Sequence, residues 1–361
     1  MNGRTGILGI ALAGISFFPH NSYGVDVYSD PAGFITLTIA GTNGSPPGTT
    51  SKLSYLGLGM TQFVVKPGRV TSAVTNELVD ANAAWATDQF NGANGPHFIE
   101  ITSGSFAGTI DDIVKTVGST KKIYTANNLV SLGLPNIVNQ TYRIRKHWTI
   151  AGVFGAANAA GLAGGAGAAS ADNILVPDGS GGFTTFFYKN VNIPPGSGIG
   201  WRKSDNLTLD ASVTKLYIDQ SVLVRRKQAS SIALKLVGSV KFGQTIVPVE
   251  TSNNFVGNVY PASVTLSNSG LYTASSTTGV APGAGAASAD TVLIDTPSGL
   301  QTFFFKNVNI PPGSGTGWRR SDDLVTDRGS TLIPLGAGFI IQRKSPRPAF
   351  DWKSPQPFVN N

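Results

Sequence analysis

The sequence predicts an all-β protein, with an N-terminal β-barrel or sandwich domain followed by two duplicated β-sandwich-like modules. Three observations predict this fold: an internal repeat at an offset of 117 residues, short apolar runs that alternate with polar residues, and frequent glycine turns. Solenoid and propeller units span roughly 20–50 residues, so the longer offset indicates a duplicated domain. We expect the N-terminal domain at 25–146 and the modules at 147–252 and 253–361.

The repeat consists of three pairs of matching segments. The central pair is identical at 18 of 22 positions, and a one-residue length change separates it from the first pair, inside a predicted turn. Turns tolerate length changes, which supports a hairpin at that point. The pairs are GAGAASAD at Gly165–Asp172 and Gly283–Asp290, Thr185–Asn206 and Thr302–Asp323, and Val222–Lys227 and Phe339–Lys344.

Each module has the residue pattern of β-strands. Residues 173–176 and 183–189 are rich in branched and aromatic side chains and flank a glycine turn, which predicts a hairpin. Residues 213–219 and 231–237 alternate apolar and polar side chains, as half-buried strands do. No stretch has a clear helical period, and the Ala/Gly tract 151–171 fits a linker, a short helix or a packed loop.

The N-terminal domain is expected to contain many short strands separated by Gly and Asn, a pattern typical of a barrel or sandwich. A basic run at its end, Arg143–Lys146, resembles the basic ends of both modules, so each domain is expected to close on a similar strand. The expected strands are 34–40, 52–60, 70–79, 98–102, 112–117 and 122–124.

Residues 1–24 have the features of an export signal. Arg4 precedes an apolar stretch at Ile7–Phe18 that is too short to span a bilayer, and small residues precede Val25. A buried N-terminal strand or helix is the alternative. The signal predicts an exported protein in the periplasm, on the outer surface or outside the cell, with no integral membrane segment after signal removal.

The composition excludes some kinds of chemical site and favours some kinds of partner. The chain has no cysteine, which excludes disulfides, thiolate metal sites and cysteine nucleophiles. Charged residues make up 13%, and the net charge is +7. The positive charge favours polyanions such as acidic polysaccharide, with a merely solvated basic surface as the alternative. No nucleic-acid-binding pattern accompanies the basic runs, so we expect no nucleic-acid partner.

The repeated Gly-Trp-Arg segments contain the candidate ligand-binding residues. A Trp beside an Arg and a Ser-Asp pair fits stacking on a sugar ring with hydrogen bonds to its hydroxyls. The alternative is a Trp that anchors a loop on the core, with the Arg covering it. The residues are Trp201, Arg202, Asp205, Trp318, Arg319 and Asp322.

No set of residues predicts catalysis, a metal site or a cofactor. His97 and His147 are far apart in sequence, and no nucleophile-elbow motif accompanies them, so an exported hydrolase is the weakest alternative. The repeated Asp172 and Asp290 fit turn or cap duty better than a calcium site, which needs about 6–8 oxygen ligands.

Several segments together resemble an exported bacterial family of β-rich repeat proteins of unassigned function. They are 25–39 (VDVYSDPAGFITLTI), 97–114 (HFIEITSGSFAGTIDDIV), 147–155 (HWTIAGVFG) and the two GAGAASAD…TFF…GWR modules. Separately, Asn253–Ala262 (NNFVGNVYPA) is similar to an NLVGNPYP pattern of secreted sandwich modules, although Val259 stands where that pattern has Pro. The resemblance implies export, a β fold and residence at the cell surface or in the periplasm.

These observations predict a non-enzymatic structural or interaction protein of the cell envelope or extracellular space, which self-associates or joins envelope partners. Two further functions stay open: a carbohydrate-binding protein that uses Trp201 and Trp318, and an exported hydrolase.

Overall fold

The computed structural model describes residues 30–358 except for 44, 46–47, 128, 130–136 and 297. Antiparallel sheets form nearly all of its regular structure, so the predicted all-β, sandwich-like fold class is confirmed. The helical elements within these residues are short: α1 (Ile150–Phe154) and the 3-10 turn η1 (Gly92–Asn94). The expected export signal at 1–24 lies outside the described residues.

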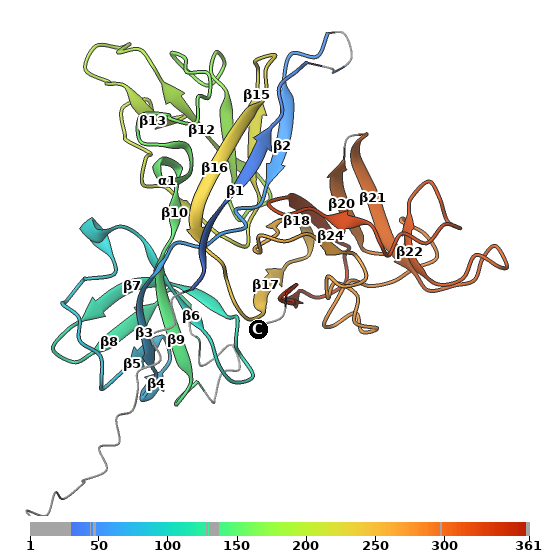
Figure 1. Ribbon diagram of the computed structural model, residues 1–361, viewed down its shortest axis with the longest axis horizontal. Coiled ribbons are helices and arrows are strands. Elements are labelled where there is room, and N and C mark those ends of the chain that lie inside the picture. The colour runs from blue at the N-terminus through green and yellow to red at the C-terminus, as the bar shows by residue number, and fades with distance from the viewer. Residues whose placement is uncertain are drawn as a thin grey trace, which may run out of the picture.

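The first module is a sandwich of a five-stranded and a two-stranded sheet (Figure 1). The large sheet has the order β13-β12-β11-β15-β2, with bounds Gly200–Lys203, Phe183–Lys189, Asn173–Pro177, Val222–Arg226 and Lys52–Leu56. The small sheet pairs β1 (Ala32–Ile39) with β16 (Ile232–Ser239). A short ribbon pairs β10 (Trp148–Thr149) with β14 (Lys215–Leu216).

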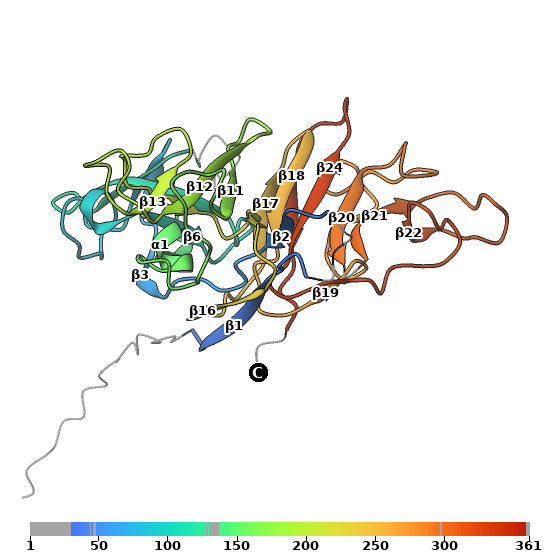
Figure 2. The same cartoon turned by 90° about the horizontal axis from the view of Figure 1, so that it is seen from above.

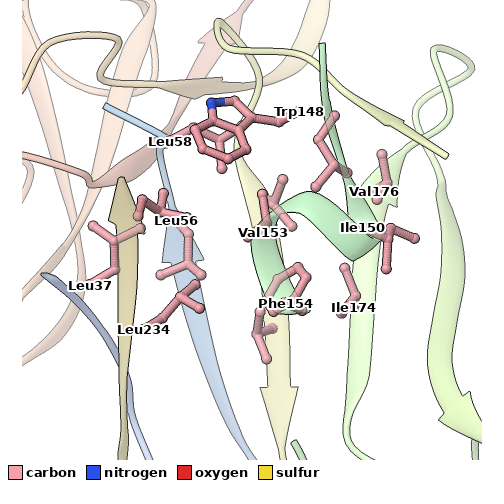
Figure 3. Packing of buried hydrophobic residues seen from close by; sticks show 14 of the residues in the cluster. Leu37, Leu56, Leu58, Trp148, Ile150, Val153, Phe154, Ile174, Val176 and Leu234 are labelled. Carbon is pink, nitrogen blue, oxygen red and sulfur yellow. The ribbon is translucent and has the colours of Figure 1, made fainter. Parts of the chain in front are cut away.

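The core of this module lies between the two sheets. Strand alternation places Ile35, Leu37 and Ile39 on the buried face of β1, while the side chains between them face solvent. Helix α1, which comes from the start of the Ala/Gly tract, contributes Val153 and Phe154 to the same core. Figure 3 shows these two side chains among residues of several strands. The tract is therefore a short helix followed by packed loops.

The second module repeats this architecture strand for strand. Its large sheet has the order β22-β21-β20-β24-β18, with bounds Gly317–Arg320, Gly299–Lys306, Thr291–Thr296, Gly338–Arg343 and Ser252–Gly257. The two smaller sheets pair β17 (Thr245–Val249) with β25 (Phe350–Ser354), and β19 (Val264–Thr265) with β23 (Leu332–Ile333). It has its own core, centred on Trp318, Phe339 and Trp352.

The N-terminal sheet is an insertion in the first module. In the second module a short connection joins β18 to β19, whereas in the first module the chain from β2 to β10 forms a separate sheet. That sheet has the order β3-β9-β6-β7-β8-β5-β4 and packs around its own core. The strands, in this order, are Val64–Arg69, Thr141–Lys146, His97–Ile101, Ile110–Val117, Lys122–Thr125, Glu77–Val79 and Ser72–Val74.

This topology affects the expected domain limits. β1 and β2, expected in the N-terminal domain, pair instead with β16 and β15 of the first module. The first module is therefore discontinuous in sequence, and the duplication includes its first two strands. The limits 25–146, 147–252 and 253–361 otherwise stay a prediction. Two expected strands also differ: 213–219 contains only the two-residue β14, and 70–79 is a hairpin that turns at Thr75, whose φ is 54°.

The two modules meet around an approximate two-fold axis. Leu56 forms a backbone bridge with Ala337, and the equivalent Val256 forms one with Gln220. The Gly57 N–H donates to the Gly336 carbonyl at 2.9 Å, and the Gly257 N–H donates to the Asp219 carbonyl at the same distance. Equivalent backbone groups thus exchange partners across the axis, as in an isologous dimer.

Glycines allow this close approach. A Cβ on Gly257 would lie 3.1 Å from the Cα of Gly57, its equivalent, and 3.0 Å from the Gln220 carbonyl oxygen. A Cβ on Gly338 would lie 1.9 Å from Oγ of Ser221, which is its equivalent in the first module. At this second contact there is space beside the axis for one side chain only, and that side chain is Ser221 of the first module.

The inserted sheet is fixed to the modules by buried ion pairs. Arg145 Nη2 lies 2.5 Å from Asp30 Oδ2, just before β1, and Lys241 Nζ lies 2.6 Å from Glu100 Oε1. Lys241 belongs to the short link between the modules, so this contact joins the insertion to both copies. Asp112 forms the third contact: it accepts a hydrogen bond from Tyr217 (2.8 Å), pairs with Lys215 and lies 2.7 Å from His147 Nε2.

We expect the Asp112 contact to make the stability depend on pH. Burial raises the Asp112 pKa, but hydrogen bonds from His147 and Lys215 outweigh it and hold the pKa well below its usual value. Because the folded pKa is below the unfolded one, this stabilisation is present above about pH 4 and is lost as the pH falls. Asp112→Asn should cost about 2 kcal/mol at pH 7 and progressively less towards pH 2. Urea unfolding at several pH values tests this, with Asp205→Asn as the exposed control; parallel pH curves for the wild type and Asp112→Asn would contradict it.

Candidate functional site

The central repeated segment contains one loop in each module, which joins the two strands at the outer edge of the large sheet. In the first module the loop joins β12 to β13, and in the second it joins β21 to β22. Since β2 and β18 lie at the module interface, β13 and β22 are the outer edges of the two sheets. Figure 2 shows them towards opposite ends of the molecule. We call residues 190–199 and 307–316 the loop tips.

A buried lysine holds each tip from beneath. Lys189 and Lys306, the last residues of β12 and β21, have no exposed surface. Lys189 Nζ donates to Ser197 Oγ and to the Gly198 carbonyl (3.2 Å), and Ser197 Oγ donates to the Pro194 carbonyl (2.5 Å). Desolvation and the neighbouring Arg202 charge lower the Lys189 pKa. The lysine ammonium group thus lies inside the loop, where it donates to a serine hydroxyl and a backbone carbonyl.

The second tip is built in the same way. Lys306 Nζ donates to Ser314 Oγ and to the Leu324 carbonyl (3.0 Å), and Ser314 Oγ donates to the Pro311 carbonyl at 2.6 Å. The backbone N–H of Gly315 donates to Asn309 Oδ1 at 2.7 Å, matching the 2.8 Å bond from Gly198 to Asn192 in the first tip. The two tips therefore share three internal hydrogen bonds, from Lys to Ser, from Ser to Pro and from Gly to Asn, and they differ in the carbonyl that the lysine also binds.

The two Trp residues of the predicted ligand sites are buried in the cores. Trp201 has no exposed surface and Trp318 is 2% exposed. The Trp201 indole N–H donates to the Gly155 carbonyl at 2.8 Å, and its ring contacts Tyr188 edge-on and Phe154 at a tilt. Stacking on a sugar needs an open ring face, and neither ring has one in this structure. The geometry supports the alternative in which each Trp anchors its loop.

The neighbouring arginines are also internal. Arg202 donates to the carbonyls of Ser197 (3.0 Å) and Leu207 (3.0 Å), and so joins the tip to the loop that follows β13. Arg319 makes the equivalent bonds to Ser314 (2.6 Å) and Leu324 (3.2 Å). Both guanidinium groups are thus occupied by backbone carbonyls.

The last pair of predicted site residues lies apart from the Trp rings. Asp205 and Asp322 are exposed and pair with the adjacent Lys203 and Arg320 on the surface. The structure therefore gathers the predicted residues around the base of each tip, but it buries the Trp and Arg side chains and leaves the Asp side chains in solvent.

Each tip has an exposed isoleucine among exposed Asn and Pro residues, and sequence reasoning missed this isoleucine. Ile193 is 64% exposed and its equivalent Ile310 is 67% exposed. A further aliphatic side chain is exposed on the loop after the next strand, Leu209 in the first module and Val325 in the second. The available signal was the KNVNIPPGSG segment, which is identical in both copies. Its Pro-Pro-Gly is typical of a turn, and this pattern does not indicate that the preceding isoleucine is exposed.

The GAGAASAD motifs have an internal role. Asp172 accepts bonds from Arg226 (2.7 Å) and from the backbone N–H groups of Ala163 (2.8 Å) and Lys227 (2.7 Å). Asp290 does the same in the second module, with Arg343 at 2.6 Å. The motif is therefore a loop closed by a buried ion pair, and its aspartate binds groups distant in sequence, whereas the sequence predicted a local turn or cap role. The described residues contain no group of His, Asp or Glu side chains arranged to hold a metal.

One arginine of each basic run is buried in the structure. Their arginines Arg145, Arg226 and Arg343 are at most 5% exposed and are paired with internal carboxylates. These three arginines are therefore not placed to bind an acidic polysaccharide, and such a partner stays a prediction.

The two histidines lie on the inserted sheet side of the molecule, away from the tips. His97 Nδ1 lies 2.9 Å from the Gly95 carbonyl, and burial lowers the His97 pKa. His147 faces Asp112, and no hydroxyl of the described residues hydrogen-bonds to its Nδ1. Nearby, where the three units meet, a cleft of about 630 Å³ is lined by five carboxylates: Asp111, Asp112, Asp219, Glu250 and Asp351.

No family model, curated protein or solved structure matches the chain. The resemblance to exported repeat proteins therefore stays a prediction. Among the described residues, no helix has the length and apolar character needed to cross a bilayer.

Proposed function

We propose that this chain is a non-enzymatic, exported interaction protein of the cell envelope or extracellular space, which binds its partner through the two loop tips. One observation carries the proposal. Each tip is held by a buried lysine and a buried arginine of its two flanking strands, while the isoleucine of the tip itself is exposed. Export rests on the residue pattern of 1–24.

The duplication supports a binding role for the tips. Burying a charged amine is costly unless hydrogen bonds compensate, and both modules meet that cost with the same bonds. A turn that merely joins two strands does not need such a network. A loop that presents an apolar side chain in a fixed conformation does, because preorganisation lowers the entropy lost on binding.

Two equivalent tips in one chain also predict bivalent binding. When both tips contact one surface, the second contact is intramolecular, and avidity can exceed either single affinity by about 10²–10⁴. An assembled envelope surface with repeated sites would gain from this arrangement. A small soluble ligand would not.

The test is co-sedimentation of the purified protein with the isolated envelope of the organism that produces it. Ile193→Asn and Ile310→Asn should each weaken binding at least tenfold, and the double variant should abolish it. Val74→Asn and Val114→Asn are the matched controls, because these valines are also exposed but lie on the inserted sheet. The proposal fails if the double tip variant binds as the wild type does, or if the control pair has the same effect.

A further inference from the structure

Strand β1 has an open edge along its whole length. It pairs with β16 on one side, and the bond from the Val240 N–H to the Pro31 carbonyl shows that odd-numbered residues face that partner. The N–H and carbonyl groups of Phe34, Thr36 and Thr38 therefore point the other way. None of them hydrogen-bonds to any other part of the described chain.

The equivalent strand of the second module has its edge closed. In β17 the outward N–H of Ile246 donates to the Gly108 carbonyl of the inserted sheet at 3.0 Å. The next outward position is Pro248, which has no N–H to offer. In the first module Thr36 lies near the middle of β1, and unlike Pro248 it has a backbone N–H that can donate a hydrogen bond.

The other edges of the described sheets are short or blocked. β13 and β22 have four residues each, and β3 contains Pro67. The free side of β16 is closed at one end by Thr61, which exchanges two backbone bonds with Ser239. β1 has eight residues, AGFITLTI, and no proline, lysine or bulge, which are the usual devices against edge pairing.

We infer that β1 pairs with β1 of a second copy of this chain across a two-fold axis. Antiparallel pairing centred on Thr36 places Phe34 opposite the second copy's Thr38, so that three of the four outward residues of each strand are matched, and the fourth, Ala32, lies opposite Ala40 just beyond the strand. The result is a continuous four-stranded sheet, β16-β1-β1-β16. The modules within one chain already associate by backbone pairing about a two-fold axis, so the same kind of contact is used twice.

The natural absence of cysteine provides a direct test. In the paired sheet the two Thr36 residues are hydrogen-bonded partners with Cα atoms about 5.5 Å apart, within reach of a short reagent that links two thiols. Such a reagent should therefore cross-link Thr36→Cys into a dimer. Thr38→Cys is the matched control, because it is equally exposed on the same strand but lies opposite position 34 of the second copy.

We expect at least ten times more cross-linked dimer for Thr36→Cys than for Thr38→Cys. Light scattering of the unmodified protein should give about twice the chain mass, and Thr36→Pro, which copies the Pro248 block, should give a monomer. Equal cross-linking of both cysteine variants, or none in Thr36→Cys, would overturn the inference even if Thr36→Pro fails to fold. This dimer does not depend on the loop tips, so either proposal can fail alone.

Discussion

Asp290→Ala is expected to lower the free energy of unfolding by about 3–5 kcal/mol, because it leaves a buried guanidinium without its counter-charge. Asp290 and Arg343 have no exposed side-chain surface, and their closest atoms are 2.6 Å apart. The carboxylate also accepts the backbone N–H groups of Ala281 (2.8 Å) and Lys344 (2.9 Å), which would be left unpaired. The substitution should therefore open the GAGAASAD loop and leave the Arg343 guanidinium buried without its counter-charge.

The measurement is denaturant unfolding followed by far-UV circular dichroism, with Asp322→Ala as the control on the surface of the same module. Burial raises the Asp290 pKa, but the backbone and arginine hydrogen bonds outweigh it and lower the pKa overall. Adding Arg343→Met to Asp290→Ala should recover part of the loss, since it removes the orphaned charge. A loss below about 1 kcal/mol for Asp290→Ala would mean that the ion pair does not close this loop.

Gly338→Ser is expected to destabilise the contact between the modules by about 1–3 kcal/mol, and Ser221→Gly is expected to reverse most of that loss. These two residues are equivalent in the duplication and meet across the axis, where a Cβ on Gly338 would lie 1.9 Å from Ser221 Oγ. Exchanging them moves the one tolerated side chain from the first module to the second. The next nearest atom to the new Cβ is then the backbone nitrogen of Leu56 at 3.0 Å, which requires a small adjustment.

The four proteins form a double-mutant cycle, measured by thermal unfolding. Ser221→Gly alone should be close to neutral, because the Ser221 hydroxyl is buried without a hydrogen-bond partner in the described structure. If the two substitutions were additive, the residues would not share a site, and the proposed two-fold contact would be wrong.

The sequence predicted much of the fold because the local signals were strong. The hairpin of β11 and β12 was identified from branched residues around a glycine turn, and the repeat revealed both modules. It did not reveal their first two strands, since Ala32–Ile39 and Thr245–Val249 share a buried face but almost no residues. The insertion between β2 and β10 further separated these strands from the module to which they belong.

The repeat pointed to residues at the base of each tip, but it could not show which of them are buried, for a physical reason. Repetition marks residues that must be kept, and it does not distinguish a buried anchor from an exposed contact. Trp201 and Arg202 are repeated because they hold the loop, while Ile193 is repeated at its apex. A tryptophan beside an arginine suggests a ligand site in any exported protein. Only the burial of Trp201 in the structure shows that its ring belongs to the core.

The most direct test of the central claim is hydrogen exchange of the protein alone and bound to isolated envelope, measured by mass spectrometry. We expect added protection at both loop tips, 190–199 and 307–316, to a similar extent. The inserted sheet should exchange at the same rate in both states. Protection of the inserted sheet with unchanged tips would contradict the account, and so would protection of one tip without the other.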